Sequence, residues 1–345
     1  MGIIGRHSFE LCSRPRIISS ASYVGDKEGK GPLRECFDKI CRDDTLGLDS
    51  WEQAESRMFE SAVRVALAKI KRQSDDLSCL LGGDLLNQII SSGFAAREIR
   101  APFIGLYGAC STISEGLMLG GMLVDGGFAE LAACAASSHF SAAERQFRYP
   151  LEMGVQAVPS SQRTVTGAGS IIIQAAGEFR PGAGNVFEHV ALTGGTIGSV
   201  EDFGITDANN MGAAMAPAAF KTIKTHLSDY SRRAEDYDRI ITGDLGIFGS
   251  DMLYELLRGE GIEIADRHED CGKLMFSPEQ NVNCGASGCG CAATVMSSWF
   301  LPKIESGEIR RVLFLATGAL MSPVSSLQGE SIPSIAHAVV IEHIY

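Results

Sequence analysis

The chain has 345 residues, of which 45% are hydrophobic and 21% charged, and this composition is typical of a folded globular protein rather than a disordered one. The formal net charge of -12 argues against nucleic acid or an anionic bilayer as the main partner, because both attract a basic surface. No secretion signal is predicted at the N-terminus, and the apolar stretch 116–138 contains Asp125 and Glu130, which disfavours a membrane-spanning helix. Ten cysteines scattered through apolar runs predict free thiols in a reducing, cytoplasmic compartment.

The predicted elements occur twice in the same order. A short apolar strand ends at Gly83-Asp84, a helix follows, a Gly-Ala-Cys turn at 108–110 opens a glycine-rich helix, and strands are predicted at 129–138 and 164–177. The second set has an apolar strand ending at Gly243-Asp244 and a helix. A Gly-Ala-Ser turn at 285–287 then opens a glycine-rich helix, and strands follow at 309–320 and 334–344.

This duplication predicts an α/β protein made of two similar halves, residues 1–180 and 184–345, separated by the Gly- and Pro-containing connector at 177–186. Small residues in the two glycine-rich helices allow neighbouring backbones to approach closely, so we expect both helices to be central and buried. Chance similarity among Gly- and Ala-rich segments is the alternative, and four pairs in one order disfavour it.

An internally duplicated α/β chain with a cysteine on a strand-to-helix turn of its first half resembles the thiolase superfamily, over nearly the whole chain. The resemblance implies a five-layer fold in which two sheets enclose a pair of central helices. It also places Cys110 at the nucleophile position. A thiol at a helix N-terminus is expected to have a lowered pKa. Alternatively, Cys110 is one more small buried residue among ten.

A condensing or acyl-transferring enzyme using Cys110 is the alternative function, and it needs hydrogen-bond donors at the thioester oxygen. The relatives implied by the resemblance use His and Asn, or two His, at those positions. Here Asp244 or Gly243 stands at the His position, while Cys284 or Gly285 stands at the Asn position. Asn283 could replace the missing amide only if the two sequences are offset by two residues. We therefore predict a protein that has the pocket but not the catalytic donors, and that uses no cofactor.

The segment 136–156 gathers hydroxyls, an imidazole and guanidiniums in one span. Its members Ser137, Ser138, His139, Arg145 and Arg148 form a set suited to binding carboxylates. In the alternative interpretation, Glu144 pairs with the arginines at a subunit contact and the serines cap a helix.

Together, the motifs GDLLNQ, GACST, SSH, AERQFRYP, TVTGAGS, GITDANNMGAAMAPAA, HEDCG, GASGCGC and SIPSIAHAVV are similar to those of one sporulation branch of this superfamily. That resemblance implies a non-catalytic protein that binds dipicolinic acid, or its calcium chelate, for uptake into the forespore. It also implies membrane proteins of the same operon as partners, a homodimer, and a peripheral position at the forespore inner membrane.

Four cysteines at 271, 284, 289 and 291 lack the paired spacing of a zinc site, and GASGCG lacks the Lys-Ser/Thr ending of a phosphate loop, so no metal is predicted. Asp84 and Asp244 occupy equivalent strand ends, where a carboxylate either lines a site or accepts hydrogen bonds from turn amides. The residues predicted to bind the ligand are Asp84, Cys110, Ser111, Ser137, Ser138, His139, Asp244, Ser287 and Gly288.

Overall fold

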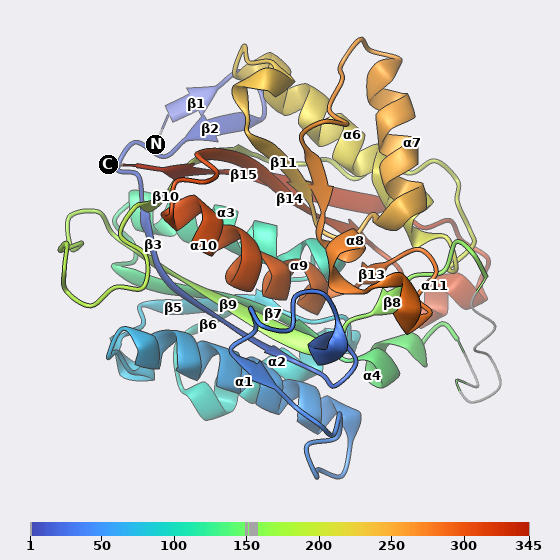
Figure 1. Ribbon diagram of the computed structural model, residues 1–345, viewed down its shortest axis with the longest axis horizontal. Helices are drawn as coiled ribbons and strands as arrows, with labels where there is room; N and C mark the ends of the chain where they lie inside the picture. Colours follow the sequence, from blue (N-terminus) through green and yellow to red (C-terminus); the bar gives the residue numbers. More distant parts are fainter. Residues whose placement is uncertain (1, 149–150, 152–157, 345) are drawn as a thin grey trace.

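The protein folds as five alternating layers of helices and sheets, as seen in a computed structural model (Figure 1). The structure describes residues 2–148, 151 and 158–344. Two outer helices lie below the first sheet, two central helices lie between the sheets, and two further helices lie above the second sheet (Figure 1). The predicted α/β class with five layers is confirmed.

The first half contains β1 (Gly2–Ile4), β2 (Ser8–Glu10), β3 (Arg16–Val24), η1 (Glu28–Lys30), β4 (Lys39–Ile40), α1 (Trp51–Lys69), η2 (Ser74–Asp76), β5 (Cys79–Gly83), η3 (Asn87–Ile89), α2 (Ile90–Ile99), β6 (Phe103–Gly105), η4 (Ala109–Ser111), α3 (Thr112–Asp125), β7 (Leu131–Ser138), α4 (Phe140–Glu144), β8 (Arg163–Thr164) and β9 (Gly167–Gln174). The second half contains β10 (Val190–Thr196), α6 (Met211–Asp229), η5 (Ala234–Asp236), β11 (Arg239–Thr242), α7 (Gly246–Arg258), β12 (His268–Asp270), α8 (Cys271–Met275), η6 (Pro278–Gln280), β13 (Ala286–Ser287), α9 (Cys289–Val295), the π-helical η7 (Met296–Phe300), α10 (Leu301–Glu305), β14 (Arg311–Ala319), α11 (Pro323–Leu327) and β15 (Ser334–His343).

The two sheets have the same strand order. The first runs β3-β9-β7-β5-β6 and the second runs β10-β15-β14-β11-β12, so each strand of one half has a counterpart in the other. In both sheets the three strands farthest from β3 or β10 are parallel, and the remaining pairings along these two orders are antiparallel. A single pairing between β3 and β10 joins the two sheets.

The repeat begins earlier than the sequence predicts, because α1 and α6 are also counterparts. Each has 19 residues, and each is followed by a short 3-10 helix that leads into the Gly-Asp strand. Both helices pack on the outer face of their own sheet. The duplicated unit is therefore a strand, an outer helix and the five elements predicted from the sequence.

The central layer consists of α3 from the first half and α9 from the second, which contact each other between the sheets (Figure 1). Every residue of α9 is buried. At Gly290 a Cβ atom would lie 2.4 Å from the carbonyl oxygen of Gly167 on β9. Glycine is therefore required there, as expected for a helix that packs directly against a sheet backbone.

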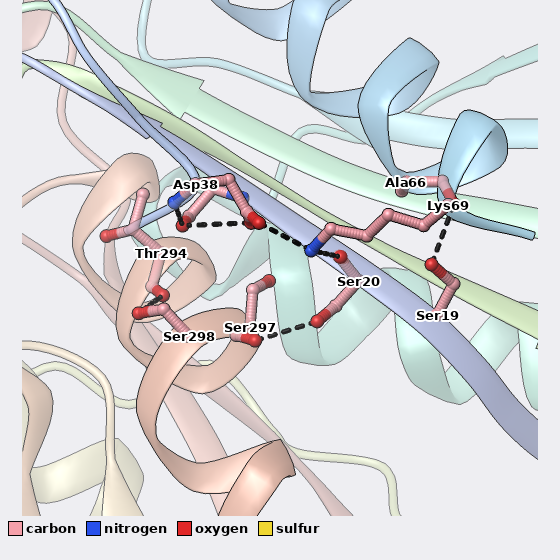
Figure 2. Close-up of polar contacts among 9 residues, drawn as sticks. Ser19, Ser20, Asp38, Ala66, Lys69, Thr294, Ser297 and Ser298 are labelled. Carbon is pink, nitrogen blue, oxygen red and sulfur yellow. Dashed lines mark hydrogen bonds and ion pairs between the residues drawn. The ribbon is translucent and has the colours of Figure 1, made fainter. Parts of the chain in front are cut away.

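Serines on β3 connect the first sheet to the layers on both sides, as Figure 2 shows. Ser19 Oγ donates to the carbonyl of Ala66 on α1 at 2.7 Å, whereas Ser20 Oγ donates to the carbonyl of Ser297 in the second half at 2.7 Å. Lys69 donates to the Ser20 carbonyl and pairs with Asp38. A buried strand can contain these hydroxyls because each has a partner.

The N-terminal hairpin of β1 and β2 crosses between the halves. It does not pair with the first sheet; instead β2 pairs with β10 of the second sheet, and Ser8 bonds to Thr196 and Asp229. The division at residues 180–184 falls in the connector between β9 and β10 and stays a prediction. None of the helices in the described residues has the length and apolar character needed to span a bilayer.

Candidate functional site

A cavity of about 460 Å³ lies where the two halves meet. The ends of β7 and β14 lead into the short helices α4 and α11, and both helices contribute to its wall. The apolar part of the wall includes Leu86, Ile89, Tyr107, Phe147 and Met321. The remaining lining residues are Asp84, Leu85, Ala109, Cys110, Ala143, Gln146, Thr164, Met211, Ser287, Gly288, Ala319, Leu320, Ser322, Pro323 and Ser325.

The cavity wall carries one carboxylate, Asp84, and no Lys, Arg or His side chain among the residues that the structure describes. Its hydroxyl and amide groups come from both halves of the chain. Tyr107 is 62% exposed, so the cavity is partly open to solvent. A small, flat ligand with polar groups at its edges matches such a mostly apolar wall.

Cys110 lies on the short helix η4, just before α3, and faces the cavity with only 6% of its surface exposed. The preceding Ala109 has a φ of 49°, a left-handed conformation that is unfavourable for a residue with a Cβ atom. At Gly318 on β14, a Cβ atom would lie 2.2 Å from the Gly108 carbonyl. The turn carrying Cys110 is therefore held tightly against the second sheet.

Asp244 lies directly behind Cys110 and is fully buried. Its carboxylate accepts hydrogen bonds from the Gly288 N–H at 2.9 Å and the Thr317 hydroxyl at 2.8 Å, and it also interacts with the Cys110 thiol. Burial raises the pKa of Asp244 to about 7. Asp244 does not line the cavity, but its protonation state sets the charge directly behind Cys110 and Gly288, which do line it.

The two Gly-Asp copies have different roles. Asp84 accepts from the N–H groups of Leu86 and Ser92 in its own turn, as a structural carboxylate would. In the second half, Asp270 accepts from Leu245 and Gly246, the amides that follow Asp244. Asp270 therefore supports the turn, and Asp244 is free to face Cys110.

The prediction of a low pKa for Cys110 is wrong. Hydrogen bonding with the Cys289 thiol, burial and the nearby Asp244 hold the pKa of the Cys110 thiol well above its ordinary value. These neighbours outweigh the helix position, because they act on a thiol that water does not screen. Cys110 is therefore protonated at neutral pH.

Four of the nine predicted ligand-binding residues line the cavity: Asp84, Cys110, Ser287 and Gly288. Five do not line it: Ser111, Ser137, Ser138, His139 and Asp244. Their polar groups are used within the fold, where Ser137 donates to Glu55 and Ser138 donates to the Val165 carbonyl. The His139 ring bonds to the Asp44 carbonyl and the Ser141 N–H, and Ser111 donates to the Gly108 carbonyl.

The predicted arginines are also paired inside the protein. Arg148 pairs with buried Glu144 at 2.7 Å, and Arg145 pairs with Glu52 of α1. These contacts agree with the alternative interpretation, in which the arginines pair with acidic side chains. Here, however, both partners of each pair belong to the same chain. Residues 149–150 and 152–156 of the motif lie outside the described residues. The Asn283 amide donates to the Val158 carbonyl rather than lining the cavity.

The cysteines at 271, 284, 289 and 291 are buried free thiols. Cys289 donates to the Ala109 carbonyl, whereas Cys284 accepts from the Phe248 N–H. In the described part of the chain, no group of three or more His, Cys, Asp or Glu side chains is arranged to hold a metal ion.

The strand order, the paired central helices and the cysteine between them define a protein of the thiolase fold, and solved structures agree. The 3-oxoacyl-(acyl carrier protein) synthase III of Pseudomonas aeruginosa PAO1 aligns with a TM-score of 0.55 at 12% identity, covering 96% of this chain and 99% of that one. Human mitochondrial 3-ketoacyl-CoA thiolase in complex with CoA aligns with a TM-score of 0.58 at 11% identity, covering 98% and 100%. At these identities the similarity establishes the fold alone.

The chain belongs to the family of stage V sporulation protein AD. Residues 5–342 match the family described as Stage V sporulation protein AD (SpoVAD). The Stage V sporulation protein AD of Bacillus subtilis (strain 168) is 43% identical over 343 residues, which is 99% of this chain and 98% of that protein. The chain is therefore a sporulation protein with a thiolase-like fold.

Cys110 should react slowly with iodoacetamide at pH 8, roughly tenfold or more slowly than the exposed Cys12, because alkylation requires a thiolate. Incubation with acetyl or malonyl thioesters should leave no acyl group on it. Mass spectrometry of the digested protein measures both results, with Cys12 as the internal control. Alkylation at the rate of Cys12, or rapid acylation, would contradict the assignment of a protonated thiol.

Proposed function

We propose that the chain binds dipicolinic acid, free or as its calcium chelate, without catalysis, for uptake into the forespore during sporulation. The observation that carries the proposal is the buried carboxyl of Asp244, which lies behind Cys110 and Gly288 in the wall of a ligand-sized cavity. A condensing enzyme needs a hydrogen-bond donor at that point. Membership of the sporulation family supports the same assignment.

The chemistry around Cys110 disfavours thioester turnover. A nucleophilic cysteine must be a thiolate, and the raised pKa of Cys110 removes that form at neutral pH. An ionised Asp244 would also repel the oxyanion that acyl transfer builds. The alternative, a condensing or acyl-transferring enzyme using Cys110, therefore has the weaker support.

The shape and polarity of the cavity suit a flat aromatic dicarboxylate. Tyr107 and Phe147 offer apolar ring surface, and Thr164, Gln146, Ser287, Ser322 and Ser325 offer neutral donors. The proposal covers both the free dianion and its calcium chelate, in which the metal neutralises the two carboxylates of the ligand.

Isothermal titration calorimetry with dipicolinate, in the presence and absence of calcium, tests the proposal on the purified protein. Isophthalate has the same two carboxylates without the ring nitrogen and serves as the control ligand. We expect saturable binding of dipicolinate and at least tenfold weaker binding of isophthalate. Equal affinity for the two ligands, or no binding of dipicolinate, would overturn the proposal.

The partners proposed for the chain are the membrane proteins encoded in the stage V sporulation A operon, and the position proposed for it is the cytoplasmic side of the forespore inner membrane. Family membership supports both proposals. Co-purification of the chain with those membrane proteins from sporulating cells is the direct test.

A homodimer formed through the edge strand β6 is also proposed. Among the residues that the structure describes, this strand pairs only with β5, and the apolar side chains of Ile104 on β6 and Phe94 on α2 are 41% and 46% exposed. An open strand edge with exposed apolar residues favours pairing with a second copy.

The variant Ile104→Lys should elute as a monomer in size-exclusion chromatography with light scattering, because a charge at the paired edge opposes association. Ile40→Lys, which changes an isoleucine of similar exposure on β4, is the control and should leave the mass unchanged. A dimer that survives Ile104→Lys would place the contact elsewhere.

A further inference from the structure

Asp244 is separated from the cavity by only two groups. The Gly288 N–H donates to its carboxylate and the Cys110 thiol interacts with it, and both residues line the cavity. A ligand that contacts Cys110 and Gly288 is therefore close to the Asp244 carboxyl. No water-filled surface lies between them to screen a charge, because Asp244 is fully buried.

The titratable groups facing Asp244 from the surrounding elements are acids and thiols. They are Asp270 of β12, Cys271 of α8, Cys291 of α9, and Cys110 with its neighbour Cys289. No salt bridge in the described residues includes Asp244. Its own partners are uncharged: the Gly288 N–H and the Thr317 hydroxyl donate to it, and the Cys110 thiol is its neighbour. A second negative charge in the cavity would therefore meet no compensating cation.

We propose that the cavity takes an anionic ligand together with a proton, and that Asp244 is the residue that holds this proton. The inference rests on the proposed function and adds the condition under which the site binds its ligand, namely that Asp244 is protonated. Two negative charges separated by a single layer of buried atoms repel strongly, and protonation of Asp244 removes that repulsion.

The direction of the pH dependence follows from the protonation of the free protein. Burial raises the pKa of Asp244 to about 7, so below pH 7 the carboxyl is already neutral and binding requires no proton uptake. A bound anion raises this pKa further. Above pH 7 a proton must be taken up, and affinity falls by up to roughly tenfold per pH unit until the pKa of the complex is reached. Above pH 7 the same carboxyl would therefore be ionised in the empty site and neutral in the occupied site.

Calorimetric titration of dipicolinate from pH 6 to pH 9 tests the inference, with Asp244→Asn, Thr317→Val and Asp84→Asn as variants. We expect the wild-type affinity to be constant up to about pH 7 and to fall roughly tenfold or more by pH 9. Asp244→Asn should lose this slope. Thr317→Val removes a hydroxyl that stabilises the ionised carboxylate, so the fall should begin at a higher pH. Asp84→Asn should retain the slope.

Titrations in two buffers with different ionisation enthalpies measure the proton uptake directly, and about one proton per ligand is expected at pH 8. A wild-type affinity that is constant from pH 6 to pH 9 overturns the inference and leaves the proposed function standing. A slope that persists in Asp244→Asn and disappears in Asp84→Asn assigns the proton to Asp84 and also overturns it. If Asp244→Asn does not fold, an unshifted Thr317→Val profile overturns it. Failure of dipicolinate to bind at any pH overturns the proposed function and this inference together.

Discussion

Replacement of Asp270 with alanine should lower the free energy of unfolding by about 3–5 kcal/mol, which is enough to unfold a large share of a marginally stable protein. Asp270 is buried, and its two carboxylate oxygens accept four hydrogen bonds. The donors are the Thr242 hydroxyl and the N–H groups of Leu245, Gly246 and Lys273. Alanine would remove the acceptor of three backbone N–H groups, including the two buried ones of Leu245 and Gly246 that hold the turn after Asp244.

Urea unfolding followed by circular dichroism measures this loss, and Asp266→Ala, an exposed carboxylate of the preceding loop, is the matched control. The control should change stability by less than about 0.5 kcal/mol. Burial raises the pKa of Asp270, so its stabilising contribution is fully present below the ordinary carboxyl pKa and is lost as the pH rises through the folded value. The loss in Asp270→Ala should therefore be larger at pH 5 than at pH 8. Similar unfolding midpoints for the variant and its control would contradict the structural role assigned to Asp270.

Replacement of Met321 with tryptophan should reduce dipicolinate affinity by at least roughly 100-fold, equivalent to about 3 kcal/mol, by filling the cavity. Met321 follows β14 and lies in the cavity wall, where its side chain is half-buried. The larger indole occupies space that the ligand ring needs. Because Met321 is not fully buried, the fold should tolerate the change better than a substitution at Cys110 would.

Val324→Trp is the control for this effect, since Val324 lies three residues further along the chain, is 64% exposed and does not line the cavity. The control should bind dipicolinate as the wild type does. Calorimetry on both variants, with thermal melting to verify folding, decides the outcome. A Met321→Trp protein that is folded and binds with unchanged affinity would place the ligand outside this cavity.

The duplicated core of the fold is predictable because strand, turn and helix signals are local. The two Gly-Asp strands and the two glycine-rich helices follow from patterns within short segments, and the structure places them as expected. The sequence pattern does not predict the strand β3, because Ser19, Ser20 and Ser22 interrupt the apolar residues that indicate a buried strand. Only the folded structure supplies the acceptors, on α1 and in the second half, that make a serine-rich strand stable at the centre of the protein.

The candidate site is less predictable, because its wall is assembled from distant segments. The stretch from Ala319 to Ser325 contributes several lining residues and carries no chemical motif. Its position at the end of β14 and the start of α11 corresponds to that of Ser138, His139 and α4 at the end of β7. The pKa of Cys110 was predicted from its own helix, whereas Asp244 and Cys289 from the other half determine it.

The pairing of β2 with β10 also constrains the order in which the chain can fold during synthesis. Residues 2–10 leave the ribosome first, but the strand they pair with spans Val190–Thr196. At bacterial elongation rates of 5–20 residues per second, the hairpin waits on the order of 10–40 s for this strand. Until then its exposed apolar side chain, Phe9, has no core to enter, although it is buried in the finished protein. A chain that stalls before residue 190 therefore leaves its N-terminus unfolded and accessible to proteases and chaperones.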